Sequence, residues 1–562
     1  MNIAKVPSSV LPKLDRFLRE TPLPLLLGVA SFGWFAAIGL RLPVDVDEGF
    51  YALAAELVTH GRMPYRDFFY PQGPLYPYLL APVVLVVGAR FLLLRAVSCV
   101  FAATAAGLVG HLVHRETRSR FATVASVVLF ATHELSWQWF TTIRTYGLGA
   151  VLLLASLVLA TPPDREPRAR ELVLAGFLGI AGPLMRLPLL PAFGIVPLAL
   201  WLRGTNAGLG RGALVLTFIV IGANAGRHPA AFAIVGSIAA VVAAIAGRGA
   251  LAATRRVAWY VLGAGLLAGP VIVVFARHWT SFRYGLVGFH ADSSSFLTFP
   301  QTRPYLAAAI GGGSILELSA YGMQNAMLLV ASLVALSLPG RATVMALLIG
   351  CVALTCGASR HAPFIEHYMT AIVPYLVVGA GFALGHLDRP AQQIDARLEH
   401  PARAVTIAAS VVFILATSSS LDKKWTLGRH NEWDDRGFRP SVLDAKAAAV
   451  ARAVRAYPGP LLTVWPGSAL RSADSVMPGY ENHFTRLVAS KKSAAEASAL
   501  HLTSGEDFRR AITKHTPRVV VLDRETVRLP GNEAGMERLV VSSGYRLLES
   551  IGDVTIYVRD DK

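Results

Sequence analysis

Acidic residues are unevenly spread along this chain, and their distribution constrains the fold more than any single motif does. Of the 36 Asp and Glu residues, 18 lie in residues 1–420 and 18 in residues 421–562. The longer part is therefore poor in acids, and it contains many apolar runs close to the length of about 20 residues that crosses a bilayer. We expect residues 1–420 to form a polytopic bundle of membrane helices, with residues 421–562 as a polar domain attached to it.

Thirteen apolar segments are predicted to span the membrane. An apolar run at 74–88 is left out, because counting it would put the arginine-rich loops and the basic N-terminus on opposite sides. We expect a short interfacial or re-entrant helix there. The N-terminus is then cytoplasmic, and residues 421–562 lie outside the cell membrane. The predicted spans are 22–40, 94–113, 120–136, 147–161, 171–183, 187–203, 211–225, 229–246, 257–276, 321–338, 342–357, 368–386 and 403–420.

Residues 421–562 show the mixed pattern of a small α/β domain, which we place on the extracytoplasmic side. The fold class is therefore mainly α, a membrane bundle of about 13 helices followed by this domain. The C-terminal sequence contains no phosphate-binding glycine loop and no metal-ligand spacing. Its predicted strands are 460–466, 517–523, 545–550 and 553–558, and its predicted helices are 440–456, 505–515 and 532–541.

The chain is basic, with a net charge of +17, of which +13 belongs to residues 1–420. No lysine occurs between residues 14 and 422, so every strong cation there is an arginine. Arginine binds phosphate in a bidentate manner, although a general preference for Arg over Lys also contributes. The charge is scattered between apolar spans, which does not favour nucleic-acid binding. It fits membrane lipids and a phosphate-bearing lipid substrate.

The first predicted outer loop, 41–93, holds five carboxylates: Asp45, Asp47, Glu48, Glu56 and Asp67. Acids beside a bilayer are costly unless they are solvated, paired or used in function. Apolar residues recur at helical spacing over 47–60, which predicts an amphipathic helix lying flat on the outer leaflet.

Asp47 is the strongest candidate for chemistry in this loop. As a helix cap it would have a purely structural role, because Asp is a favoured N-cap residue. As a general base it would benefit from Asp45 and Glu48, whose like charges raise its pKa. Both roles are compatible. An acidic cluster also permits a divalent metal without requiring one, so no metal ligand is assigned.

Two further clusters are expected at the same level of the membrane. THELSWQWFTTIRTYG (132–147) supplies Arg144 and Tyr146, and SRHAPFIEHYMTAIVP (359–374) supplies Arg360, His367 and Tyr368. The histidines of these segments fit no closed zinc motif. Arg144 and Arg360 each lie at the outer end of a predicted span, within reach of a lipid headgroup.

The segment DEGFYALAAELVTHGRMPYRDFF followed by PQGPLYPYLLAP resembles the first outer loop of the GT-C membrane glycosyltransferases. Within that family, the segment resembles the protein O-mannosyltransferase branch and the bacterial enzymes that transfer aminoarabinose or galacturonate to lipopolysaccharide. In that family an Asp-Glu pair opens the loop, and an amphipathic helix and a Pro-Pro-Leu-aromatic segment follow. The resemblance extends over residues 22–203.

The resemblance implies transfer of a sugar from a polyprenyl-phosphate donor to an acceptor on the outer face, with inversion. The acceptor would be a cell-envelope glycan, a lipid or a protein. Asp47 matches the catalytic acid–base position and Glu48 its partner. The candidate substrate-binding residues are Asp45, Tyr65, Arg66, Asp67, Gln72, Arg144, Tyr146, Arg360, His367 and Tyr368.

This sequence departs from the family pattern at two positions. Gln72 stands where relatives often have a lysine assigned to the donor phosphate, and Arg144 stands in a loop where many relatives carry an aspartate. We expect Arg144 or Arg66 to supply the missing cation.

Two other functional classes remain open. A transporter or flippase for a lipid-linked saccharide would place its charges along a midplane path, whereas here the acids gather at one face and no inverted repeat is visible. A non-catalytic membrane scaffold would use the acidic cluster only to cap a helix.

Overall fold

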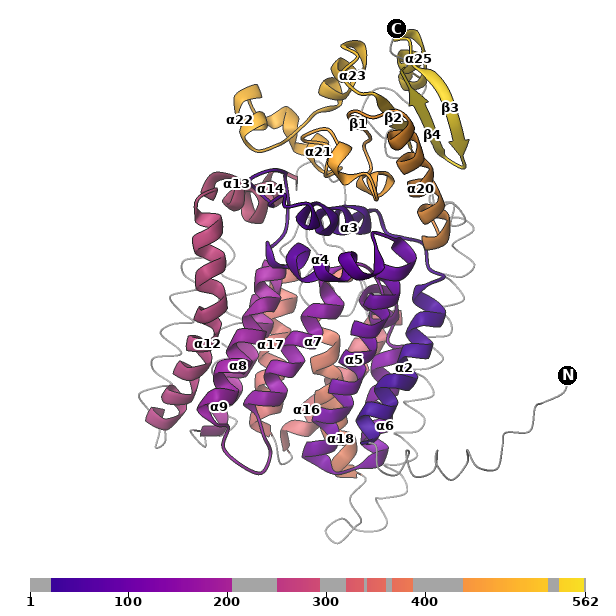
Figure 1. The fold of residues 1–562 in the computed structure, drawn as a ribbon. Coiled ribbons are helices and arrows are strands. Elements are labelled where there is room, and N and C mark those ends of the chain that lie inside the picture. Colours follow the sequence, from indigo (N-terminus) through magenta and orange to yellow (C-terminus); the bar gives the residue numbers. More distant parts are fainter. Residues whose placement is uncertain are drawn as a thin grey trace, which may run out of the picture.

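The computed structural model describes residues 22–204, 250–293, 320–337, 341–359, 366–387, 438–523 and 535–559. A bundle of long helices carries two short helices, α3 and α4, across one end, and the C-terminal residues cover that end (Figure 1). We call it the α3 end of the bundle.

Ten of the thirteen predicted spans fall within described residues, and each coincides with a helix. The other three, 211–225, 229–246 and 403–420, lie outside the described residues. The helices are α2 (Leu23–Gly39), α5 (Phe91–Thr117), α6 (Arg120–Thr132), α7 (Thr145–Ala160), α8 (Ala169–Met185), α9 (Leu190–Gly204), α12 (Ala250–Ala276), α16 (Ala320–Val334), α17 (Arg341–Ser359) and α18 (Val373–Leu387).

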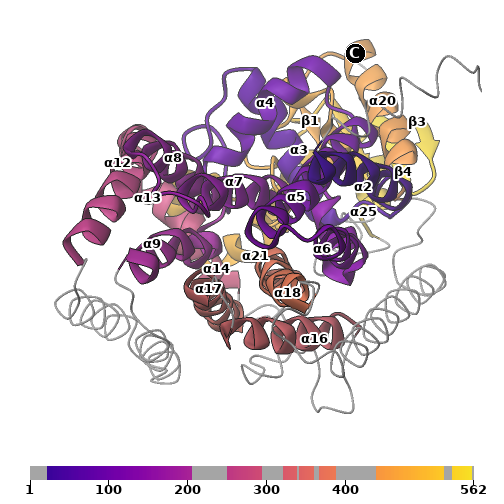
Figure 2. The ribbon, with the colours of Figure 1, turned by 90° about the horizontal axis from the view of Figure 1, so that it is seen from below.

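Seen along the bundle, α12 and α8 lie at one side and α2 and α6 at the other, with α7 and α5 between them (Figure 2). Within the described residues, four helical stretches are long and apolar enough to cross a bilayer, namely Phe91–Thr117, Leu187–Gly204, Leu251–Ala276 and His367–His386. Apolar side chains such as Val273 and Val330 are 66% and 62% exposed on the outside of the bundle. Surfaces of this kind suit lipid rather than water, and the protein is a membrane protein.

Helix α3 (Val46–Thr59) confirms the helix predicted at 47–60, and α4 (Leu75–Val87) confirms a short helix within 74–88. The expectation that α3 lies flat on a lipid surface is wrong. Its residues from Glu48 to Leu57 are all buried. Helix α4 packs against α3 from the bundle side, and the 3₁₀ helix η7 (Pro466–Ala469) packs against it from the C-terminal side. The local sequence pattern of α3 does not show that residues more than 400 positions later in the chain pack on top of it.

The loop between α3 and α4 rests on the end of α8. A Cβ on Gly73 would lie 2.2 Å from the carbonyl oxygen of Leu184, so only glycine permits this approach. Within the loop, the hydroxyl of buried Tyr65 donates to the carbonyl oxygen of Gln72. These contacts place Gln72 beside the chain that leaves α8.

The C-terminal residues form a four-stranded sheet in the order β1-β2-β4-β3. Strands β1 and β2 are parallel, and the other pairs are antiparallel. Each strand and helix predicted here coincides with an observed one. They are β1 (Leu461–Leu462), β2 (Val519–Leu522), β3 (Arg546–Ile551), β4 (Val554–Val558), α20 (Pro440–Ala456), α23 (Gly505–Thr513) and α25 (Gly535–Ser542).

The C-terminal residues are attached closely to the start of α3. Trp465 donates from Nε1 to the carbonyl oxygen of Val46 at 3.0 Å. A Cβ on Gly49 would lie 2.7 Å from the backbone nitrogen of Gly467. This close contact holds the C-terminal residues directly above the first turn of α3.

Candidate active site

The first turn of α3 presents a carboxylate that its own helix does not use. The N-cap is Asp45 rather than Asp47, because the helix begins one residue earlier than predicted. Asp45 accepts from the backbone N–H of Asp47 at 3.0 Å, and Glu48 accepts from the N–H of Asp45 at 2.8 Å. This capping box satisfies the helix start, and the side chain of Asp47 is free to face the bundle.

Arg144 brings two carboxylates together. It lies immediately before α7, after the π-helix η1 (Ser136–Phe140), a type of irregularity common at functional sites. Its Nη2 lies 2.8 Å from Oδ2 of Asp47 and also bonds Oδ1 of Asp45. The guanidinium lies over the ring of Trp139, 5.0 Å from its centroid, and its Nη1 is 3.5 Å from Nε2 of His367. A single buried cation therefore serves both acids.

Burial raises the pKa of Asp47 from 3.8 to about 6. Arg144 opposes this rise by favouring the carboxylate, whereas the charge of Asp45 adds to it. A carboxyl group with a pKa near 6 is ionised at neutral pH and still accepts a proton readily. Asp47 therefore has the protonation behaviour of a general base.

Glu48 has a different environment, although it follows Asp47 directly. It is fully buried, and Arg95 donates to both of its oxygens. One oxygen also accepts from the N–H of Asp45, and the other accepts from the N–H of Ile143 at 2.9 Å. Both oxygens thus have two donors each, so Glu48 joins the start of α3, α5 and the chain before Arg144.

A second buried arginine lies in the same site. The guanidinium of Arg186 lies over the rings of Tyr146 and Tyr368, at 4.7 and 5.5 Å from their centroids. It is 5% exposed, and among the described residues no carboxylate lies within ion-pair distance of it. Tyr51, one helical turn after Asp47, and Tyr146 have hydroxyl groups without a hydrogen-bond partner in the described structure. The site thus holds unused donors beside a cation.

Five of the predicted binding residues meet around Asp47. They are Asp45, Arg144, Tyr146, His367 and Tyr368.

Four other predicted residues form a separate group in the loop between α3 and α4. Arg66 is about half exposed and pairs with Asp67 at 2.6 Å. Tyr65 bonds the backbone of Gln72, as described above. No hydrogen bond or ion pair in the described part of the chain links these four with Asp47. Arg360 lies outside the described residues.

The described residues contain no group of three or more His, Cys, Asp or Glu side chains that could hold a metal ion. His133 is buried, and its Nε2 lies 3.1 Å from Oδ1 of Asn325. The oxygens of Asp45 and Asp47 face the guanidinium of Arg144.

Sequence reasoning gave no role to Arg95 or His483, and it counted Arg186 only among the arginines expected to face the outside. Arg95 lies inside a predicted span, and Arg186 follows the end of one, so an arginine at the outer end of a span was the available signal for Arg186. His483 comes from the C-terminal residues, and its Nε2 lies 3.9 Å from Oδ1 of Asp47. Nothing in its local sequence, PGYENHFTR, indicates that position.

Neither the protein-family models nor the curated proteins include a match to this sequence. Two solved structures of ArnT from Cupriavidus metallidurans do match the fold. The one bound to undecaprenyl phosphate is 13% identical, covers 95% of this chain and 97% of its own, and has a TM-score of 0.57. The apo form is also 13% identical, covers 98% of each chain, and has a TM-score of 0.55. At an identity this low, the match shows only that the fold is shared. The chain has the GT-C fold of membrane glycosyltransferases.

Proposed function

We propose that this protein is a membrane glycosyltransferase that moves a sugar from a polyprenyl-phosphate donor to an acceptor hydroxyl or amine. The observation that carries the proposal is Asp47, a carboxylate that is 19% exposed and has a pKa of about 6, beside Arg144 in a GT-C fold. The fold match to a structure bound to undecaprenyl phosphate supports a lipid-phosphate donor.

In the proposed reaction, Asp47 accepts the proton of the acceptor group while the acceptor atom attacks the anomeric carbon. The new glycosidic bond forms as the bond from that carbon to the phosphate oxygen breaks. The electron pair of the broken bond leaves with the polyprenyl phosphate, which gains negative charge. Attack from the face opposite the phosphate inverts the anomeric configuration. Buried cations stabilise the leaving group most, because little water screens them.

Arg186 is the best-placed residue for the donor phosphate. No acid neutralises it among the described residues, whereas Arg144 already serves two carboxylates. It follows the end of α8 that Gly73 touches, so it lies close to Gln72, where the family resemblance leads one to expect a lysine. Arg66, the other candidate for the missing cation, is exposed and paired with Asp67. We therefore assign the phosphate to Arg186, with the hydroxyl groups of Tyr51 and Tyr146 as neutral donors.

Glu48 acts as a positioning residue in this proposal. Its two oxygens are occupied by four donors, so neither is left for a substrate. Because it bonds the N–H of Ile143, it fixes the backbone that carries Arg144 to Asp47.

The two alternative functions, a transporter or flippase and a non-catalytic scaffold, fit this site less well. A flippase needs charges along the membrane path, but Glu48, Arg95, Arg144 and Arg186 gather at the α3 end of the bundle. A scaffold would need Asp47 only as a helix cap, and Asp45 already fills that position. The proposal also places the reaction on the outer face of the cell membrane, with an extracytoplasmic C-terminal domain. The acceptor would be a cell-envelope glycan, a lipid or a protein.

The test is sugar transfer by purified protein from a synthetic polyprenyl-phosphate sugar. Asp47→Asn keeps the shape of the side chain and removes the base, so we expect transfer to fall at least about 100-fold. Asp164→Asn is the matched control, because Asp164 is exposed and, among the described residues, pairs with Arg118 alone, at 3.1 Å. Near-normal turnover by a folded Asp47→Asn protein would refute the assignment.

A further inference from the structure

The C-terminal segment Gly479–Phe484 places two buried polar side chains near Asp47. Asn482 and His483 are 2% and 5% exposed. The segment is fixed by Glu481, which pairs with Arg62 of the first loop and accepts from the N–H of Gly479 at 2.7 Å. Asn482 also accepts from the N–H of Phe484 through its Oδ1 at 2.9 Å, so the segment is held in place by contacts that leave the side-chain nitrogens of Asn482 and His483 unused.

The nitrogens of both side chains lack partners in the part of the chain that the structure describes. Nδ1 and Nε2 of His483 and Nδ2 of Asn482 are all buried without a hydrogen bond. Leaving one such group unpaired costs about 1–3 kcal/mol, so three in adjacent residues are unusual in a folded protein. A bound polar molecule would remove that cost.

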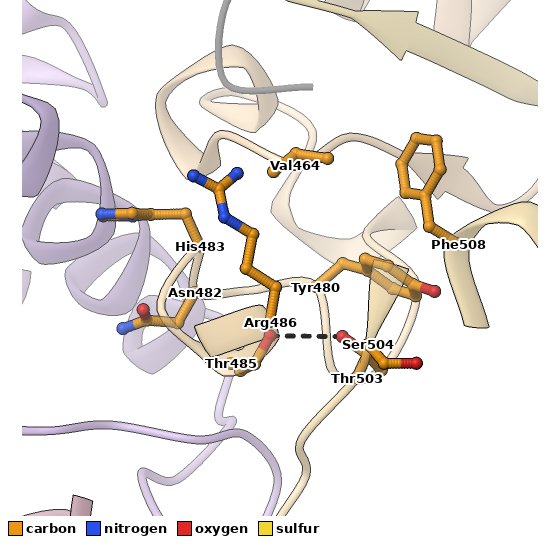
Figure 3. A pocket seen from close by; sticks show the side chains of 9 residues that line it. All are labelled: Val464, Tyr480, Asn482, His483, Thr485, Arg486, Thr503, Ser504 and Phe508. Atoms are coloured by element: carbon orange, nitrogen blue, oxygen red, sulfur yellow. Dashed lines mark hydrogen bonds between the residues drawn. The ribbon is translucent and has the colours of Figure 1, made fainter. Parts of the chain in front are cut away.

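Both side chains are directed toward the first half of the chain. Asn482, His483 and Phe508 line a small pocket, which Figure 3 shows from close by. Asn482 and His483 point to the purple helices, away from Phe508 at the other side of the pocket. Val464, Tyr480 and Arg486 also line this pocket. The free nitrogens thus face the part of the molecule that carries Asp47.

The geometry at Asp47 suits a shared ligand atom. Nε2 of His483 and Oδ1 of Asp47 are 3.9 Å apart, too far for a direct hydrogen bond. A single oxygen at about 2.8 Å from each atom fits between them. Burial, with help from Arg486 and Arg144, lowers the pKa of His483 well below its usual range. The imidazole is therefore neutral, with one donor and one acceptor nitrogen.

We propose that His483 and Asn482 form the acceptor subsite, and that His483 positions the attacking hydroxyl group of a saccharide against Asp47. This inference rests on the proposed function and names the acceptor class. A hydroxyl oxygen has two lone pairs, so one can accept from His483 while the other attacks. Its proton passes to Asp47. Three unpaired nitrogens exceed what one isolated hydroxyl can satisfy, which favours a polyhydroxylated acceptor.

The test uses the purified full chain, a synthetic polyprenyl-phosphate sugar as donor, and a detergent extract of the host membranes as the acceptor source. Transfer is measured against the amount of extract, after the extract has been separated into saccharide and protein fractions. Binding of polyprenyl phosphate alone is measured in parallel. We expect His483→Ala to lower transfer at limiting extract about 10- to 100-fold and to raise the half-saturating amount. Binding of polyprenyl phosphate should stay within about twofold of the wild type.

Two further variants separate positioning from folding. His483→Gln retains hydrogen-bonding atoms and should recover part of the loss, and its melting temperature should match the wild type. His515→Asn is the matched control, because His515 is exposed and its left-handed backbone suits asparagine. It should transfer normally.

The outcomes distinguish this inference from the proposed function. If the wild type transfers sugar to the saccharide fraction and His483→Ala matches it at every extract concentration, the inference is wrong and the proposed function stands. Transfer to the protein fraction alone would also overturn the acceptor class. If the wild type transfers no sugar to any fraction, the proposed function fails and the inference fails with it.

Discussion

The charge of Asp45 should set the pH at which Asp47 becomes active. Asp45→Asn removes that charge and keeps a favoured N-cap, because the asparagine carbonyl still accepts from the N–H of Asp47. The charge of Asp45 raises the pKa of Asp47, and Arg144 lowers it. In the variant the first influence is lost and Arg144 has a single carboxylate to serve. Both changes lower the pKa of Asp47.

The magnitude follows from the position of Arg144 between the acids. Its Nη2 is 2.8 Å from Asp47 and no farther from Asp45, so the two oxygens are at most twice 2.8 Å apart. Like charges at about 5.6 Å repel by about 3 kcal/mol at an effective dielectric constant of about 20, which equals about 2 pH units. Arg144 lies between the two carboxylates and screens part of this repulsion. We therefore expect the pKa of Asp47 to decrease by about 1 unit in Asp45→Asn.

The assay is kcat/KM for sugar transfer between pH 4.5 and 8, with each protein normalised to its own plateau. A general base works in its ionised form, so activity rises with pH and levels off above the pKa. The wild type should have its acid limb at about 6. At pH 5 about one-tenth of Asp47 is then ionised in the wild type and about half in Asp45→Asn. An acid limb that stays in place or moves to higher pH in a folded variant would refute the reasoning.

Three further sets of variants probe the site and its supports. Glu48→Gln and Arg95→Met should each lower the free energy of unfolding by about 3–5 kcal/mol, so that the monodisperse protein is lost at a lower temperature. The double variant should lose less stability than the two single variants added together. Additive losses would contradict the buried pair. Arg186→Met should weaken binding of polyprenyl phosphate at least about 10-fold and Arg186→Lys less, whereas unchanged binding would remove Arg186 from the donor site. Gly73→Ala should reduce thermal stability because its Cβ would clash with Leu184, and a neutral result would argue against that close contact.

The sequence predicted the elements of this protein well because each depends on a local pattern. Apolar length predicted the spans, and the mixed pattern of residues 421–562 predicted β3 and β4 within a few residues. The acidic start of α3 was also recognised. The identity of its N-cap was not, because Asp45 and Asp47 are equally suitable caps and only the register of the helix decides between them.

The residues around Asp47 could be predicted where they belong to the acidic first loop or lie near the ends of spans. Arg144, Tyr146 and Tyr368, which lie in the cluster around Asp47, could be proposed because charged and aromatic groups at the end of a span are visible in the hydropathy pattern. The roles of Glu48 and His483 could not be read in this way. Glu48 depends on Arg95, a partner 47 positions away, and His483 depends on how the C-terminal residues dock on α3. Long-range contacts of this kind leave no periodic signal in the chain.

The most direct test of the central claim is a single-turnover reaction of the purified protein with a synthetic polyprenyl-phosphate sugar at pH 7.5, with host-membrane acceptor in excess. Product sugar and released polyprenyl phosphate are counted together. The wild type should form them in equal amounts, and Asp47→Asn should bind the donor but form neither. Equal product formation by Asp47→Asn, or sugar that stays on the lipid with the wild type, would contradict the account.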